Sequence, residues 1–159
     1  MSFEATVQQW AAAARSAVLT DVKAITKMAH ENIVSDTPID TGRAKSSWNV
    51  VEGANPDLSV TPELEGFDNP ISGAVIRQSA KGASPLTAGQ AHTAAFAQHQ
   101  NIEAAKTPVL TISNNLDYII PLEKGSSKQT DNEAGMIFTV NVHKARTDAV
   151  DAGFAASFA

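Results

Sequence analysis

Residues 37–48 have the sequence TPIDTGRAKSSW, which predicts a turn between a long helix and a strand. Proline disfavours helical backbone at the residue before it, so a preceding helix has to stop by about Asp36. Asp40 and Thr41 have side chains that bond their own backbone in turns, and Gly42 supplies a free φ angle. We therefore interpret the stretch as an architectural turn in which Asp40 bonds backbone amides.

Before the turn, apolar residues recur every three or four positions, which predicts one continuous amphipathic helix. The stripe consists of Phe3, Val7, Trp10, Ala14, Val18, Val22, Ile25, Ala29 and Ile33. Ser2 is the expected N-cap. At 1.5 Å per residue the helix is roughly 45–50 Å long, more than a domain of this size covers. The stripe either packs in the core throughout, or part of it packs on a neighbouring subunit.

Beyond the turn, residues 46–51 predict a strand, and Trp48 is expected to pack against the long helix. Residues 52–73 contain five acidic residues and no basic residue. They show neither helical nor strand periodicity, so we expect an exposed acidic loop, followed by a short strand at 74–76. This loop is either simply solvated, or it faces DNA or a partner ring.

A second helix is expected over residues 86–106, which are rich in alanine. Ser84 can cap this helix, Pro85 suits its first position, and Thr107 with Pro108 ends it. Small alanine side chains would allow close approach to another backbone.

The remaining segments alternate in character. Residues 109–113 are β-branched and predict a strand, and 116–123 form a compact apolar turn. Residues 125–135 are polar. Residues 137–142 alone are compatible with a strand, but a longer 4-3 pattern favours a C-terminal helix. That pattern consists of Met136, Val140, His143, Thr147, Val150, Phe154 and Phe158.

Together these elements predict one α+β domain over residues 1–159. A long N-terminal helix packs on a small, mostly antiparallel sheet, with an alanine-rich second helix and a C-terminal helix. The chain has no cysteine, which excludes a disulfide scaffold and suits a reducing compartment. We expect neither a secretory signal nor a membrane span. The net charge of −5 opposes a role in gripping phosphates.

The triplet Asp40-Thr41-Gly42 matches the catalytic loop of aspartic proteases, but its surroundings favour the turn. Aspartic proteolysis needs two carboxylates that share a proton at a dry, apolar base. Here Thr37 and Pro38 precede the triplet, and the cation of Arg43 follows it. A neighbouring Arg lowers the pKa of a carboxyl group and so works against proton sharing.

Other site chemistry is poorly supported by the sequence. His92 and His99 are seven residues apart, too far for the usual i,i+4 metal chelation, and no third ligand stands out. The glycines form no phosphate-binding loop. We therefore expect no enzyme, no cofactor and no metal.

Two separated blocks carry a family resemblance. The first is residues 37–48, and the second comprises ISNNLDY at 112–118, LEKGSSKQ at 122–129 and Gly135-Met136. In this order they resemble the tail-component or neck protein family of lambda-like tailed bacteriophages, also described as head–tail joining or tail-completion proteins. The alanine-rich helix between the blocks also fits the layout of this family.

The resemblance implies a non-enzymatic structural protein of the virion, assembled in the bacterial host cytoplasm. It would form a homo-oligomeric ring at the neck, with six copies favoured by tail symmetry and twelve as the alternative. Its neighbours would be connector, head-closure, tail-terminator or tail proteins, and DNA would pass without sequence-specific binding. The alternatives are an assembly adaptor or chaperone that leaves the virion, and a hydrolase that uses Asp40.

Two sets of residues follow as candidate sites. The structural turn comprises Pro38, Asp40, Thr41, Gly42, Arg43 and Trp48. The candidate subunit contact, expected to become ordered on assembly, comprises Tyr118, Leu122, Glu123, Gly125, Ser127, Lys128 and Gln129.

Overall fold

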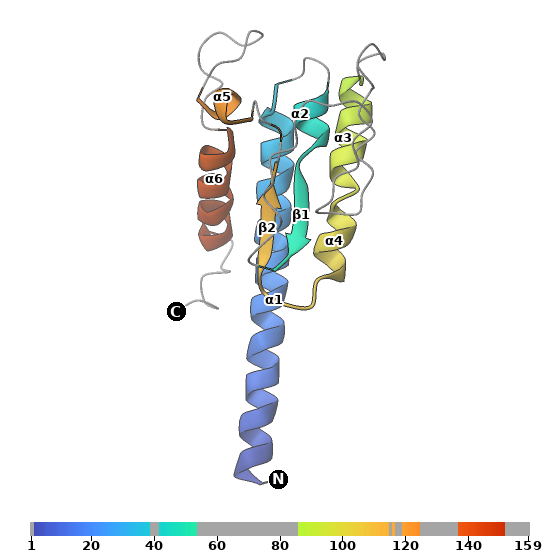
Figure 1. Ribbon diagram of the computed structural model, residues 1–159. Coiled ribbons are helices and arrows are strands. Elements are labelled where there is room, and N and C mark those ends of the chain that lie inside the picture. The colour runs from blue at the N-terminus through green and yellow to red at the C-terminus, as the bar shows by residue number, and fades with distance from the viewer. Residues whose placement is uncertain are drawn as a thin grey trace.

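The computed structural model in Figure 1 describes residues 2–38, 42–53, 86–114, 116, 119–124 and 137–151. The predicted acidic loop from residue 54 onward, the strand at 74–76 and the polar segment 125–135 lie outside these residues. The described part has the predicted α+β architecture: a long N-terminal helix, a small antiparallel sheet and further helices.

Helix α1 spans Phe3–Asp36, and both of its ends follow the sequence rules. The Ser2 side chain accepts a hydrogen bond from the Ala5 amide, as predicted for the N-cap. At the other end Thr37 leaves the helix in an extended conformation, as its position before proline requires. Lys45 donates to the Ser35 carbonyl, so a cation satisfies one of the terminal carbonyls of α1.

The prediction of a strand over residues 46–51 was wrong at its start. A short helix, α2, occupies Arg43–Ser46, and strand β1 spans Asn49–Glu52. Gly42 is the N-cap of α2, and its carbonyl accepts a hydrogen bond from the Ser46 amide. The two serines lack the β-branched shape that favours strands, which is found in Val50 and Val51.

Strand β1 pairs antiparallel with β2, Leu110–Ser113, close to the predicted position of that strand. Among the described residues, side chains rather than a strand bond the other edge of β1. Asn101 donates its amide to the Val50 carbonyl at 3.0 Å, and the Gln98 amide oxygen accepts from the Val50 amide at 3.5 Å. These bonds occupy the backbone amide and carbonyl of Val50, which an open strand edge would offer to another chain.

This edge contact also explains why the predicted helix over 86–106 is two helices. Helix α3 spans Ala88–Phe96 and α4 spans His99–Ala104. Between them Gln98 is buried, and its side chain reaches β1 and Asn101. The expected Ser84 cap is also incorrect, because Thr87 caps α3 and forms a capping box with Gln90.

Helix α5 spans Ile119–Glu123 and α6 spans Ile137–Asp151, so the described part of the last segment is helical, as favoured. The face of α6 was predicted incorrectly. Val140, His143 and Thr147 are exposed. The buried residues are Ile137, Asn141, Ala145 and Ala149. Small alanines suit close packing of α6 on α1, and Asn141 on the same face donates to the Asp36 carboxylate of α1.

These elements surround only one half of α1. In Figure 1 the sheet, α6 and the α3–α4 pair gather around its C-terminal half, while its N-terminal half extends beyond them. The core cluster consists of Ile33, Val34, Trp48, Ala95 and Ile137, with Phe96, Ile112 and Ile119 packed against it. We call residues 21–36 the inner half of α1 and residues 3–20 the outer half.

Candidate functional site

The predicted turn is a tightly packed corner. Pro38, Gly42, Arg43 and Trp48 lie within the described residues, whereas Asp40 and Thr41 lie outside them, so the bonding of Asp40 stays a prediction. Gly42 has φ of +77°, as its role in the turn required. A Cβ at Gly42 would lie 2.8 Å from the Leu86 Cβ and 3.1 Å from the Leu86 carbonyl oxygen, so the position admits only glycine without a shift.

Trp48 joins this corner to the end of α1, as predicted. Its indole Nε1 donates to the Thr37 Oγ1 at 2.8 Å, and that hydroxyl donates to the Ile33 carbonyl. The ring is 4% exposed and stacks on Phe138 of α6, with centroids 6.0 Å apart. One aromatic residue therefore links α1, β1 and α6.

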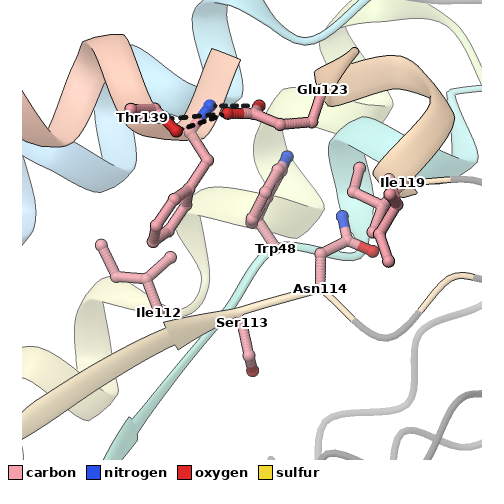
Figure 2. Close-up of a pocket in the computed structure, with 9 residues that line it drawn as sticks. Trp48, Ile112, Ser113, Asn114, Ile119, Glu123 and Thr139 are labelled. Atoms are coloured by element: carbon pink, nitrogen blue, oxygen red, sulfur yellow. Dashed lines mark hydrogen bonds between the residues drawn. The ribbon is translucent and has the colours of Figure 1, made fainter. Parts of the chain in front are cut away.

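An apolar groove opens beside the Trp48–Phe138 pair, with a volume of about 320 Å³. Figure 2 shows its walls, which come from Trp48 just before β1, the end of β2, α5 and α6. Its apolar lining consists of Trp48, Ile112, Ile119, Ile120 and Phe138. Ile120 is 61% exposed and Phe138 is 36% exposed, so part of this apolar lining lies in water. We call this feature the α5–α6 groove.

Glu123, a candidate contact residue, has an internal role at the rim of this groove. Its carboxylate accepts hydrogen bonds from the Phe138 and Thr139 amides at 2.8 and 3.0 Å, and from the Thr139 hydroxyl (Figure 2). These amides belong to the first turn of α6 and have no partner within the helix. A carboxylate is also favoured there by the helix dipole. Glu123 thus caps α6 from fourteen positions before its first residue, a spacing that no capping pattern in the sequence reveals.

Of the other candidate contact residues, only Leu122 lies within the described part of the chain. It is half-buried in α5. Tyr118, Gly125, Ser127, Lys128 and Gln129 lie outside it, so their role in a subunit contact stays a prediction. The sequence did not identify Ile120 and Phe138 as surface residues, since each sits in an apolar segment that equally fits a core.

A histidine cluster lies behind Trp48. His30 is fully buried in α1, and its Nε2 donates to the Trp48 carbonyl at 3.3 Å. Because that carbonyl only accepts, the Nδ1 of His30 accepts from the Nε2 of His99, also at 3.3 Å. Burial lowers the pKa of His30 to about 4. The hydrogen bond to the Trp48 carbonyl acts in the other direction and raises this pKa, while the neighbouring His99 lowers it slightly further. Burial also lowers the pKa of His99, while Glu31 opposes that shift.

The two histidines that the sequence placed seven residues apart, His92 and His99, do not meet. The Phe96 ring lies between them: its centroid is 4.7 Å from the centroid of the His92 ring and 5.0 Å from that of the His99 ring. Within the described residues no group of three histidine or acidic side chains is arranged to hold a metal ion. The cluster is therefore a packing and hydrogen-bonding unit that joins α1, α3 and α4.

The outer half of α1 is the other unusual surface. Phe3 is 86% exposed, Val7 47% and Trp10 72%. They are the first three residues of the predicted apolar stripe, and they occupy one face of the helix. No residue of the outer half is buried, whereas the inner half buries Ala29, His30, Ile33 and Val34 among others.

No protein family model, curated protein or solved structure matches this chain. Within the described residues, no helix combines the length and the apolar character needed to cross a membrane.

Proposed function

We propose that this chain is a non-enzymatic structural protein of a tailed-phage virion. It forms a homo-oligomeric ring at the neck, at the head–tail junction or the top of the tail, and joins or completes these parts. One observation carries the proposal: the outer half of α1 holds Phe3, Val7 and Trp10 in water on one face. Clustered apolar side chains of this kind mark surfaces that a partner covers.

A second observation supports the family resemblance on which the ring rests. The two resembling blocks are separated in sequence, but their described residues form one structural unit. Asn49, directly after the first block, pairs with Ser113 of the second block across the sheet. The Asn114 side chain donates to the Ala44 carbonyl at 2.9 Å. Similar residues in both blocks would therefore preserve one corner, not two independent loops.

The ring is tested by the mass of the purified protein under native conditions. Six times the subunit mass is expected, and twelve times is the alternative that the ring allows. Negative-stain images should then show closed rings. A protein that stays monomeric up to high micromolar concentration would contradict the proposal.

The place in the virion needs a separate test. Immunogold labelling of purified virions should mark the junction of head and tail. If the protein oligomerises but is absent from purified virions, it is an assembly adaptor instead.

We further propose that DNA passes the ring without being gripped. The net charge of −5 makes the subunit repel the phosphate backbone. Of the acidic residues at 52–73, Glu52 lies at the end of β1, where its carboxylate accepts from the Lys106 and Thr107 amides. A gel-shift assay at low salt should show no tight duplex binding. Tight binding that weakens steeply with salt would instead reveal a local basic patch.

A further inference from the structure

We infer that Phe3, Val7 and Trp10 of one copy dock into the α5–α6 groove of a neighbouring copy. This inference rests on the proposed ring, because it names the contact that joins successive subunits. It is drawn from two exposed apolar features of the same chain, one convex and one concave.

The convex feature has the spacing of a helix that binds in a groove. Phe3, Val7 and Trp10 stand at positions i, i+4 and i+7, the anchor pattern by which an amphipathic helix enters an apolar groove. All three are exposed, and the helix that carries them is continuous with the core. Aromatic anchors of this type supply much of the binding energy at interfaces.

The concave feature is suited to such anchors. The α5–α6 groove has a volume of about 320 Å³, and its lining combines five apolar side chains with four polar residues, Ser113, Asn114, Glu123 and Thr139. Ligand and peptide sites commonly have this mixture of aliphatic and aromatic walls with a polar rim. The rim carboxylate of Glu123 is already bonded to the amides of α6, so it does not demand a cationic partner.

A single molecule cannot make this contact within itself. The groove lies beside Trp48, which bonds Thr37 at the C-terminal end of α1, while the anchors begin at Phe3 at the other end. Figure 1 shows α5 and the outer half of α1 at opposite ends of the molecule. Because α1 is one uninterrupted helix, its outer half is held away from its own groove. The occupant therefore comes from another molecule.

Charge also favours a second copy over a charged partner. Between residues 2 and 20 the charged residues are Glu4 and Arg15, which cancel. A largely uncharged helix surface does not suit a nucleic acid or a strongly charged protein, but it suits an apolar groove with a satisfied rim. The outer half of α1 and the α5–α6 groove are therefore matched in their low net charge.

The two aromatic anchors alone would supply about half of the area that a standard interface buries on each partner. Burying Phe3 and Trp10 would remove about 300–500 Å² from water, at about 150–250 Å² for each aromatic side chain. A standard interface buries about 800 Å² per partner. In a ring each copy uses its anchors on one neighbour and its groove on the other, so both surfaces are covered. Contact between two different surfaces gives a closed ring when the rotation closes.

Charge substitutions on both surfaces test the contact. Trp10→Asp on the helix and Ile120→Asp in the groove should each weaken association at least about tenfold in analytical ultracentrifugation. Ala12→Asp is the matched control, because residue 12 lies on the opposite face of the outer half and is also exposed. All three positions are exposed, so circular dichroism and thermal melts should match those of the parent protein.

Cross-linking then identifies the two surfaces directly, since the chain has no cysteine of its own. Val7→Cys protein mixed with Ile120→Cys protein should give covalent dimers with a short bis-maleimide, and each variant alone should give few. Dimers from Val7→Cys alone would show that neighbouring α1 helices pack on each other, which overturns the inference. An oligomer of unchanged mass without Val7–Ile120 cross-links also overturns it but leaves the ring standing. A parent protein that is monomeric overturns the ring itself.

Discussion

The two halves of α1 carry the same apolar stripe but have different surroundings. In the inner half, Ile33 is fully buried and Ala29 is 4% exposed, whereas in the outer half Phe3 is 86% exposed. Residues such as Val22 and Ile25, in the middle of the stripe, are half-buried. The stripe therefore states which face of the helix is apolar, and distant parts of the chain decide how much of it is covered.

The covering residues come from far along the sequence. Trp48, Ala95 and Ile137 surround Ile33 and Val34. Nothing in the described structure covers Phe3, Val7 and Trp10 in this way. In line with the proposed ring, we propose that the inner half stabilises the subunit and that the outer half joins subunits.

The difference between the two halves is tested most directly by shortening one apolar side chain in each half and comparing the losses of stability. Ile33→Ala should lower the free energy of unfolding by about 2–5 kcal/mol, since it leaves a cavity in the core. Val7→Ala should change it by less than about 0.5 kcal/mol in the monomer. Urea denaturation at low protein concentration measures both. Equal losses would mean that the outer half is covered within the subunit.

The same contrast explains which features of the fold could be predicted from the sequence. The apolar periodicity predicted that α1 is a helix. Ser2 and Thr37-Pro38 predicted its two ends to within a residue, because capping and the effect of proline act locally. The same reasoning located β2 and the helical character of the last segment. It misjudged the faces, since burial on α6 depends on small side chains that approach α1, and Ala145 and Ala149 contributed little to an apolar pattern.

The candidate site was predicted only in its local part. The positive φ of Gly42 and the packing of Trp48 on α1 followed from turn chemistry and an aromatic anchor. The groove and the Glu123 cap depend on contacts between α5 and α6, which no local pattern encodes. The break at Gln98 has the same origin, because a buried side chain serves the edge of β1.

A second test concerns His30, a titratable residue that is fully buried in the inner half. Its pKa is about 4 in the folded protein, below its ordinary value of 6.5, so the folded state favours the neutral ring. The associated stability is present above pH 6.5 and is lost as the pH falls toward 4. The loss should reach about 3 kcal/mol, at 1.36 kcal/mol for each pH unit.

Chemical denaturation at pH 7, 6, 5 and 4 measures this dependence. His30→Gln retains hydrogen-bonding capacity but cannot gain a proton, so its stability should fall less steeply between pH 6.5 and 5, where few carboxylates titrate. An unchanged slope in this variant would assign the acid sensitivity to other groups. No titratable residue of comparable burial exists in the outer half.

A third test addresses the corner that returns the chain onto the inner half. Gly42→Val should destabilise the protein by about 2–3 kcal/mol, because positive φ strains a branched residue and the new Cβ meets Leu86. Gly53→Val is the matched control. Gly53 has φ of +110° but nothing within 4 Å of a Cβ, so strain alone should cost about 1 kcal/mol. Thermal melts of equal midpoint would show that the close approach to Leu86 contributes nothing.

The smallest effect is expected at Glu123, which holds the first turn of α6 where that helix covers the inner half. Asn141 of α6 donates to the Asp36 carboxylate and Ile137 joins the core, so the position of α6 bears on the burial of α1. Glu123→Ala should cost about 1 kcal/mol, the usual loss for a removed N-cap. Glu123→Gln should cost less, because its amide oxygen still accepts one bond. Hydrogen exchange should report the loss as faster exchange of the Phe138 and Thr139 amides. The outer half of α1 should exchange as in the parent protein, and faster exchange there would mean that the two halves are not independent.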